Sequence, residues 1–264
     1  MGYWDKADQN KKIAATHTEE MSIKYDEEIR VCVSKTWVYD ITLSSPTPLS
    51  TLGFKGEILV EATDSVSAIF NVNTTCSGKT AVLNFASYTE PGGRFLDGSS
   101  AQEECLCHAS FLYNVLKEKP NYYADNAKAK NKALYTNKAL YSPRVIFINK
   151  KGETTTADVI TCASPNLTAA VKYCRIPKRA NKCALESRIG FVLDIAYLER
   201  VENLVLGAFG CGVFGQDPKE VSEIFKDKLN GGKYHFKKVI FAIPGGVNLE
   251  KFKETFNAPA NCVK

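Results

Sequence analysis

The sequence predicts an α/β fold in which helices cover both faces of a mostly parallel central sheet. Short apolar runs rich in Val and Ile alternate with helical patterns along the chain. Such continuous runs are typical of strands that are buried on both faces. The predicted strands cover residues 57–63, 80–87, 144–150, 158–164, 203–209 and 237–243. Residues 29–43 are predicted to form a further strand, at an edge of the sheet.

Helices are predicted from apolar residues that recur on one face at helical spacing. Two such stripes are Cys105, Ala109, Leu112 and Leu116, and Leu185, Ile189, Val192 and Ala196. A third helix follows Asp217 as the N-cap and Pro218 in the first turn, and a last helix covers 248–256. Residues 117–141 are interpreted as a long surface excursion.

Length and composition indicate one globular domain. The chain has 264 residues, of which 44% are hydrophobic and 24% charged. We expect a single domain over 1–264, in which 1–56 is an N-terminal helical and strand extension packed on the core. No apolar run approaches the roughly 20 residues that cross a bilayer, and the polar N-terminus does not resemble a signal peptide. These features predict a cytoplasmic protein without a membrane partner.

The cysteines and charges predict neither a metal nor a cofactor. The nine cysteines are scattered, form no C-x-x-C pair, and are accompanied by only three histidines. The net charge of +5 suits a partner that carries phosphates. Lysines and tyrosines interleave over 117–138, but acids are present there too. We therefore interpret this stretch as a solvated face and expect no direct nucleic-acid binding.

Two glycine-rich loops are the features of the sequence that indicate ligand binding. They are "TEPGGRFLDGSSAQEE" (89–104) and "GAFGCGVFGQDP" (207–218), each between a predicted strand and a predicted helix. Glycine turns ahead of a helix let backbone N–H groups close on a phosphate, so two loops suit a diphosphate. Neither loop fits the P-loop or the dinucleotide fingerprint. Tight turns without a ligand are the alternative for either loop taken alone.

Glu103 and Glu104 stand at the start of the predicted helix behind the first loop. Glu103 fits a capping box with Ser100, which accounts for one glutamate and leaves Glu104 unassigned. The alternative is that both face a ligand held by the loops. A helix N-terminus lowers a carboxyl pKa, whereas burial and a bound diphosphate raise it. The balance decides whether Glu104 can hold a proton near neutral pH.

The combined motifs resemble the microbial-type poly(ADP-ribose) glycohydrolase family. The matching segments are "LNFAS", "PGG-x-F-x-x-G-S-x-AQEE-x-L", "S-x-LY", "YSPRVIFI", "VITCASPN" and "LGAFGCGVFG-x-DP". They follow one another in order over nearly the whole chain. The resemblance implies a macrodomain-like, three-layer α/β/α fold. It also implies an ADP-ribosyl glycohydrolase that binds ADP-ribose and ADP-ribosylated proteins and needs no cofactor.

The resemblance also implies a role for each matched residue. Glu104 would be the catalytic acid and base, and Glu103 would hold hydroxyls of the ribose whose bond is cut. Asn84 would contact the same ribose, and Phe214 would pack against it. Asp64 and Ile243 are assigned to the adenine end. The remaining ligand-binding positions are Gly92, Gly93, Arg94, Gln102, Gly210, Cys211, Gly212 and Val213.

One position departs from the family pattern, which usually shows three glycines where this chain has Gly92, Gly93 and Arg94. The guanidinium of Arg94 could clamp the diphosphate, crowd the groove, or point to solvent. Crowding would favour a mono-ADP-ribosylated protein, for example one modified on arginine, over the polymer as substrate.

Three rival interpretations compete with the hydrolase. A reader module that binds ADP-ribose without turnover is opposed by the intact Gln-Glu-Glu motif, and the missing motifs make a kinase or dehydrogenase remote. Cysteine chemistry at Cys105, Cys107 and His108 is disfavoured because neighbouring side chains on a helix point apart. Cys105 is expected in the core.

Overall fold

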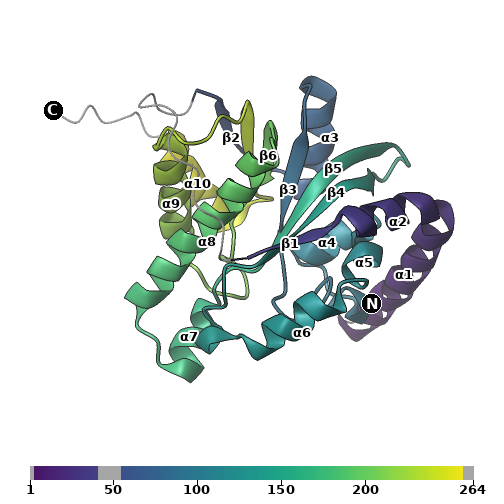
Figure 1. The fold of residues 1–264 in the computed structure, drawn as a ribbon, viewed down its shortest axis with the longest axis horizontal. Helices are drawn as coiled ribbons and strands as arrows, with labels where there is room; N and C mark the ends of the chain where they lie inside the picture. The colour runs from purple at the N-terminus through teal and green to yellow at the C-terminus, as the bar shows by residue number, and fades with distance from the viewer. Residues whose placement is uncertain (1–2, 41–54, 258–264) are drawn as a thin grey trace.

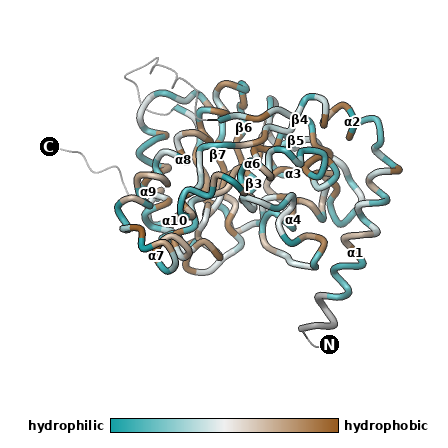
Figure 2. The backbone as a smooth tube through the Cα atoms, turned by 60° about the horizontal axis from the view of Figure 1, so that its bottom comes forward, coloured by the Kyte–Doolittle hydropathy of each residue, from teal (hydrophilic) through white to brown (hydrophobic). Residues whose placement is uncertain are grey.

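The structure is a computed structural model that describes residues 3–40 and 55–257. One sheet lies between two layers of helices (Figure 1). In both backbone views, α1 (Tyr3–Lys24) lies on one side of the strands, and α9 (Pro218–Asn230) and α10 (Gly246–Asn257) lie on the other (Figure 1 and Figure 2). The predicted three-layer α/β class is confirmed.

The sheet has seven strands in the order β1-β4-β5-β3-β6-β7-β2. They are β1 (Trp37–Tyr39), β2 (Glu57–Glu61), β3 (Thr80–Phe85), β4 (Ala139–Ile148), β5 (Thr154–Cys162), β6 (Asn203–Leu206) and β7 (Lys238–Ala242). From β5 to β2 all neighbours are parallel, while β4 is antiparallel to β5 and β1. The carboxyl ends of β3, β5, β6, β7 and β2 therefore share one edge of the sheet.

The strand expected over 29–43 is wrong for most of its length. Residues up to Lys35 belong to α2 (Asp26–Lys35), and only β1 is a strand, at the predicted edge of the sheet. The alternating apolar residues mimic a strand. Three acids in the first turn of α2 and the burial of Cys32 in the core favour the helix instead. Residues 41–43 lie outside the described residues.

Alternate residues of each strand supply two separate cores. Ala81 and Leu83 of β3 face α8 (Lys178–Leu198), α9 and α10, while Val82 faces α1 to α6. The remaining helices are α3 (Ser65–Thr75), α4 (Gln102–His108), α5 (Leu112–Leu116), α6 (Pro120–Lys128) and α7 (Leu167–Cys174), with 3-10 turns η1 (Phe95–Asp97) and η2 (Asn131–Ala133). Within the described ranges, no helix combines the length and apolar character needed to cross a membrane.

The helix predictions are confirmed in part. Asp217 caps α9, because its carboxylate accepts from the backbone N–H groups of Lys219 and Glu220. The single stripe expected from Cys105 to Leu116 is instead two helices, α4 and α5. At the break, the Ser110 hydroxyl donates to the carbonyl of Leu106 and accepts from the N–H of Leu112. Ser110 also pairs with β4 through an isolated bridge, so sheet contacts end the first helix early.

The stretch 117–141 is more than a surface excursion. It contains α6, whose inner side chains Tyr122, Tyr123 and Asn126 are buried under the first glycine loop. The lysines and tyrosines in this stretch concealed the buried face, because both residue types combine an apolar body with a polar tip. The exposed residues of this stretch are 117–118, the outer face of α6, and the segment from the end of α6 into η2.

A buried arginine joins three segments near the site. Arg188 of α8 is 1% exposed. Its guanidinium donates to the Asn137 side chain at 2.8 Å, to the carbonyl of Leu134 at 3.4 Å, and to the carbonyl of Ala163. The loop before β4 is thereby fixed against the end of β5. A buried cation is stable here because backbone and amide oxygens solvate it.

We predict that Arg188→Met destabilises the fold by about 3 kcal/mol or more, because each buried oxygen left without a donor costs roughly 1–3 kcal/mol. Urea unfolding measures the change. Arg179→Met, an exposed position on the same helix, is the control and should change stability by less than about 0.5 kcal/mol. Equal midpoints for the two variants would contradict the role given to Arg188.

Candidate active site

Both glycine loops leave the same edge of the sheet. The first follows β3 and leads into α4, and the second follows β6 and leads into α9. Since β3 and β6 are parallel neighbours, their loops emerge side by side at their carboxyl ends. Ligands in open α/β sheets gather at this edge. The edge is therefore where the predicted site residues are expected to meet.

Glu103 and Glu104 are both buried at the start of α4, at 3% and 6% exposure. Glu103 accepts from the Ser87 backbone N–H at 2.6 Å and from the Asn84 amide at 3.1 Å. Glu104 accepts from the Arg94 backbone N–H at 2.9 Å through Oε1. Its buried Oε2 has no hydrogen-bond partner among the described residues. One oxygen of Glu104 is thus fixed while the other is free for a ligand.

The capping-box interpretation of Glu103 is wrong. The residue before α4 is Ala101, which makes no side-chain cap bond, and Glu103 turns inward to the end of β3. Burial raises the pKa of Glu103 to about 8, against the lowering effect of the Ser87 and Asn84 donors, and the charge of Glu104 adds to the increase. Glu103 is therefore mostly neutral near pH 7.

Gln102 and Asn84 lie behind the glutamates. The Gln102 amide accepts from the Phe85 N–H and donates to the Leu83 carbonyl, both at 2.9 Å, so it clamps α4 to the end of β3. Asn84 is fully buried, and its amide nitrogen contacts Glu103 and Thr161 while its Oδ1 has no partner among the described residues. Ligand contact by either residue stays a prediction.

The first glycine loop fits tightly over the two carboxylates. Gly93 has φ 60°, and a Cβ there would lie 2.6 Å from Oε1 of Glu104 and 2.9 Å from Oε2 of Glu103. Gly92 has φ 68°, and a Cβ would lie 2.8 Å from the ring of Tyr113. Both positions therefore require glycine.

Arg94 occupies an ordinary backbone conformation, with φ −108°. Its side chain is 77% exposed and pairs with Asp97 at 3.0 Å. Of the three orientations considered from the sequence, the structure has the one toward solvent. The backbone N–H of Arg94, rather than its guanidinium, contacts Glu104.

The second glycine loop lies against the end of β5. Gly210 has φ 78°, and a Cβ there would lie 2.3 Å from the Ser164 hydroxyl. Gly212 faces open space, Cys211 is half-buried, and Val213 is 87% exposed. The backbone at 212–213 is therefore accessible to a ligand.

An aromatic wall joins the two loops. The Tyr88 ring stacks on Tyr135 with centroids 4.0 Å apart, and Tyr135 meets Phe214 edge-on at 6.1 Å. Neither tyrosine was singled out from the sequence, and neither was Ser87. The backbone amide of Ser87 carries no sequence signal, and Tyr135 reaches the site only through the folding of the loop before β4.

A cavity of about 1410 Å³ lies at the same edge of the sheet but on the far side of α4 from the glutamates. Asp64 and Ile243 line it together with Phe85 and Gln102, so the two residues assigned to the adenine end are brought together. Neither Glu103 nor Glu104 lines it. The two glutamates therefore lie outside this cavity, beside the first glycine loop.

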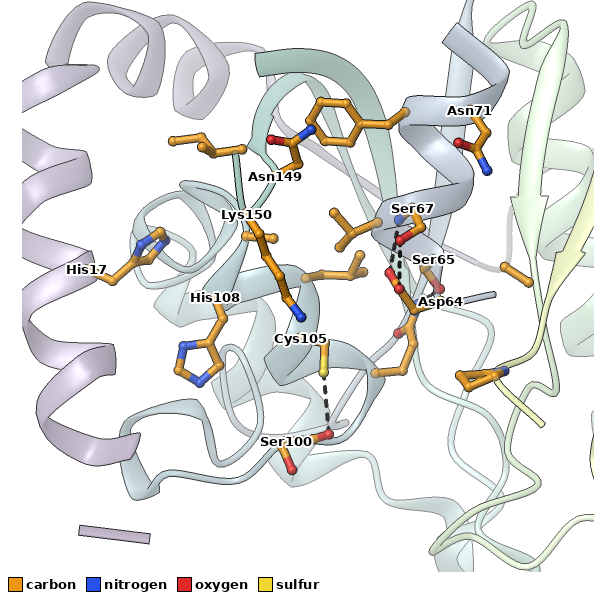
Figure 3. A pocket seen from close by; sticks show the side chains of 18 of the residues that line it. His17, Asp64, Ser65, Ser67, Asn71, Ser100, Cys105, His108, Asn149 and Lys150 are labelled. Atoms are coloured by element: carbon orange, nitrogen blue, oxygen red, sulfur yellow. Dashed lines mark hydrogen bonds between the residues drawn. The ribbon is translucent and has the colours of Figure 1, made fainter. Parts of the chain in front are cut away.

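Figure 3 shows the side chains of this cavity. Asp64 caps α3 by accepting from the N–H and hydroxyl of Ser67, and Lys150 extends across the cavity toward Cys105 (Figure 3).

Cys105 is exposed, so its expected place in the core is wrong; Cys107, on the inner face of α4, is buried instead. In the part of the chain that the structure describes, no group of three His, Cys, Asp or Glu side chains could hold a metal.

Comparison with known proteins gives one family. The model of the microbial-type PARG catalytic domain matches residues 6–150. Poly(ADP-ribose) glycohydrolase (PARG) of Thermomonospora curvata, bound to the inhibitor ADP-HPD, is 30% identical with TM-score 0.81, covering 94% of this chain and 99% of that one. PARG of Deinococcus radiodurans in complex with ADP-ribose is 28% identical with TM-score 0.75, covering 87% and 97%. No curated protein matches the chain.

We predict that Glu103→Gln changes how stability depends on pH. The pKa of Glu103 is 4.5 when unperturbed and about 8 in the folded protein. Between these values the folded protein keeps a proton that the unfolded chain releases, so wild-type stability falls as pH rises, by at most about 1.4 kcal/mol per pH unit. Relative to the variant, the wild type should be more stable near pH 5 than near pH 8. Urea unfolding of both proteins over this pH range tests the prediction. Parallel curves of unfolding free energy against pH would contradict the raised pKa of Glu103.

We predict that Gly93→Ala destabilises the protein by about 2 kcal/mol or more, because a left-handed Ala costs roughly 1–2 kcal/mol and its Cβ displaces Glu104. Gly212→Ala is the matched control: its φ is outside the left-handed region and no atom lies within 4 Å of the added Cβ. Thermal unfolding should separate the two variants. If both variants unfold at the same temperature as the wild type, the loop does not approach the two glutamates as closely as the structure indicates.

Proposed function

Because this chain belongs to the microbial-type poly(ADP-ribose) glycohydrolase family, we propose that it releases ADP-ribose from poly(ADP-ribose) with Glu104 as the single acid and base. Membership makes it a glycohydrolase that acts on ADP-ribose linkages. The observation that carries the finer proposal is the state of Glu104: one oxygen is held by a backbone N–H, and the other is buried without a partner among the described residues.

Bond cleavage then needs one carboxyl in two protonation states. Protonated Glu104 donates to the oxygen that leaves ribose C1, and the sugar passes through an oxocarbenium-like state. The ionised Glu104 takes a proton from the attacking water, which adds to C1 and regenerates the acid. Glu103 does not act as the opposing carboxylate of ordinary glycosidases, because neighbours in one helical turn do not face each other. It orients the ribose hydroxyls instead.

The remaining contacts follow the shared edge of the sheet. The diphosphate lies between the two glycine loops, near Gly93 and Gly212, and Phe214 packs against the ribose. The adenine lies toward Asp64 and Ile243, which line the same cavity. The solved PARG of Deinococcus radiodurans holds ADP-ribose, which supports this class of ligand.

Arg94 favours the polymer as substrate. The side chain points to solvent and pairs with Asp97, so it does not fill the groove beside Glu104. The reason to prefer a mono-ADP-ribosylated substrate therefore weakens.

We also propose that α1 and α2 are part of the same domain, because Ala14, Met21 and Cys32 are buried in the same core as α4.

We predict that Glu104→Gln lowers the rate of ADP-ribose release from a poly(ADP-ribosyl)ated protein by about 10²–10⁴-fold, as expected for loss of a general acid and base. Binding of free ADP-ribose should persist, since Gln can still accept from the Arg94 N–H. Glu118→Gln, at an exposed position remote from the loops, controls for loss of a charge.

An arginine-linked mono-ADP-ribosylated protein is assayed beside the polymer. Release from the mono-modified protein alone would reject the polymer as substrate. ADP-ribose binding by the wild type without release from either substrate would indicate a reader module and remove Glu104 from catalysis.

A further inference from the structure

A basic surface lies beside the second glycine loop. The sequence contains no Asp or Glu over 126–152 or over 159–185. The exposed parts of these stretches meet in space, because η2 packs against α7 and the backbone N–H of Asn166 donates to the carbonyl of Ala133 at 2.9 Å. In Figure 1, α6 and α7 lie along the same end of the molecule. The two acid-free segments thus form one surface.

Apart from Lys172, six cations on this surface are exposed, and none of the six forms an ion pair within residues 3–40 and 55–257. They are Lys128, Lys130, Lys132, Arg175, Lys178 and Arg179. We name this group the basic platform. Its charge is uncompensated locally, unlike that of Lys138 and Lys182 nearby, which pair with Asp125 and Glu220.

The basic platform continues from the aromatic wall of the site. The N–H of Thr168, in the first turn of α7, donates to the carbonyl of Phe214 at 3.2 Å. Tyr135, two residues after η2, contacts both Phe214 and Tyr88. Tyr88 follows Ser87, whose N–H holds Glu103. The platform therefore begins at the glutamate end of the site, away from Asp64 and Ile243.

The platform also carries an exposed ring. Tyr173 is 73% exposed, and the ammonium of Lys172 lies 5.2 Å from its ring centroid. Single-stranded nucleic acids are bound by this pairing of cations, which follow the phosphates, with aromatic side chains, on which bases stack. Poly(ADP-ribose) has the same two chemical groups, a diphosphate and an adenine in each unit.

We propose that the basic platform binds the units of poly(ADP-ribose) that lie beyond the bond to be cleaved. When the terminal unit occupies the site with adenine toward Asp64, the rest of the polymer leaves from the glutamate end, where the platform starts. The cavity at the other end has mixed charge, with Glu20 and Asp64 beside Lys24 and Lys150, and does not attract a polyanion in the same way. This inference rests on the proposed function and adds the recognition of a long chain to it.

The test neutralises four platform charges in one variant, Lys128→Gln, Lys130→Gln, Lys178→Gln and Arg179→Gln. The matched control removes four exposed cations on other faces: Lys12→Gln, Lys35→Gln, Lys55→Gln and Lys253→Gln. Polymer binding is measured in the Glu104→Gln background, so that the chain is not consumed, and KM for long polymer is measured with Glu104 intact. Free ADP-ribose is the probe of the folded site.

We expect the platform variant to bind long polymer about 10-fold or more weakly than the control, with a correspondingly raised KM, and to bind free ADP-ribose unchanged. The slope of log Kd against log salt should fall by about 0.7 for each phosphate that the variant no longer neutralises. Equal polymer affinity in the platform and control variants would overturn the proposal.

A single-stranded RNA of similar length separates the polymer from nucleic acid. If the wild type binds the RNA as tightly as the polymer and the platform variant binds neither, the surface is a nucleic-acid site and the polymer assignment fails. If the wild type releases no ADP-ribose while the platform variant still fails to bind polymer, the proposed activity fails and the platform stands. If ADP-ribose is released but the platform variant has the same KM for long polymer as the control variant, the platform proposal is rejected and the proposed activity stands.

Discussion

Two carboxylates buried next to each other impose the architecture of this site. Glu103 and Glu104 lie out of water at the end of β3, where Asn84 of the strand donates to Glu103 only. Backbone N–H groups supply the further donors, from Ser87 just before the first glycine loop and from Arg94 within it. The loop can come close enough only because Gly93 has no Cβ. The positions of the two carboxyl groups thus depend on main-chain atoms, which other elements hold in place.

That support comes from the opposite half of the chain. The loop before β4 brings Tyr135 between Tyr88 and Phe214, so a row of three rings connects the segments of the two glycine loops. Arg188 fixes the same loop to the end of β5 from beneath. Arg188 therefore helps to position the loop that carries Tyr135, although its own side chain is buried.

The fold class, six of the strands and the two glycine loops were predictable because they depend on local patterns of apolar residues and glycines. Asp217 was equally predictable, since an N-cap needs only its own helix. The break between α4 and α5 was not, because the apolar stripe runs on while Ser110 pairs with β4. The role of Arg188 was not predictable from its helix, because the oxygens that it contacts belong to loops distant in sequence. The sequence left two orientations of Glu103 open, a cap on its own helix or a place facing a ligand, because its donors come from β3 and the segment that follows.

The N–H of Arg94 has a consequence for how such a site can diversify. Since the main chain makes the contact to Glu104 and φ is −108°, every residue type except proline is compatible with this position. The side chain at position 94 is consequently not needed for this contact. Substitutions there can change the size and charge of the surface beside Glu104 while the main-chain hydrogen bond stays in place.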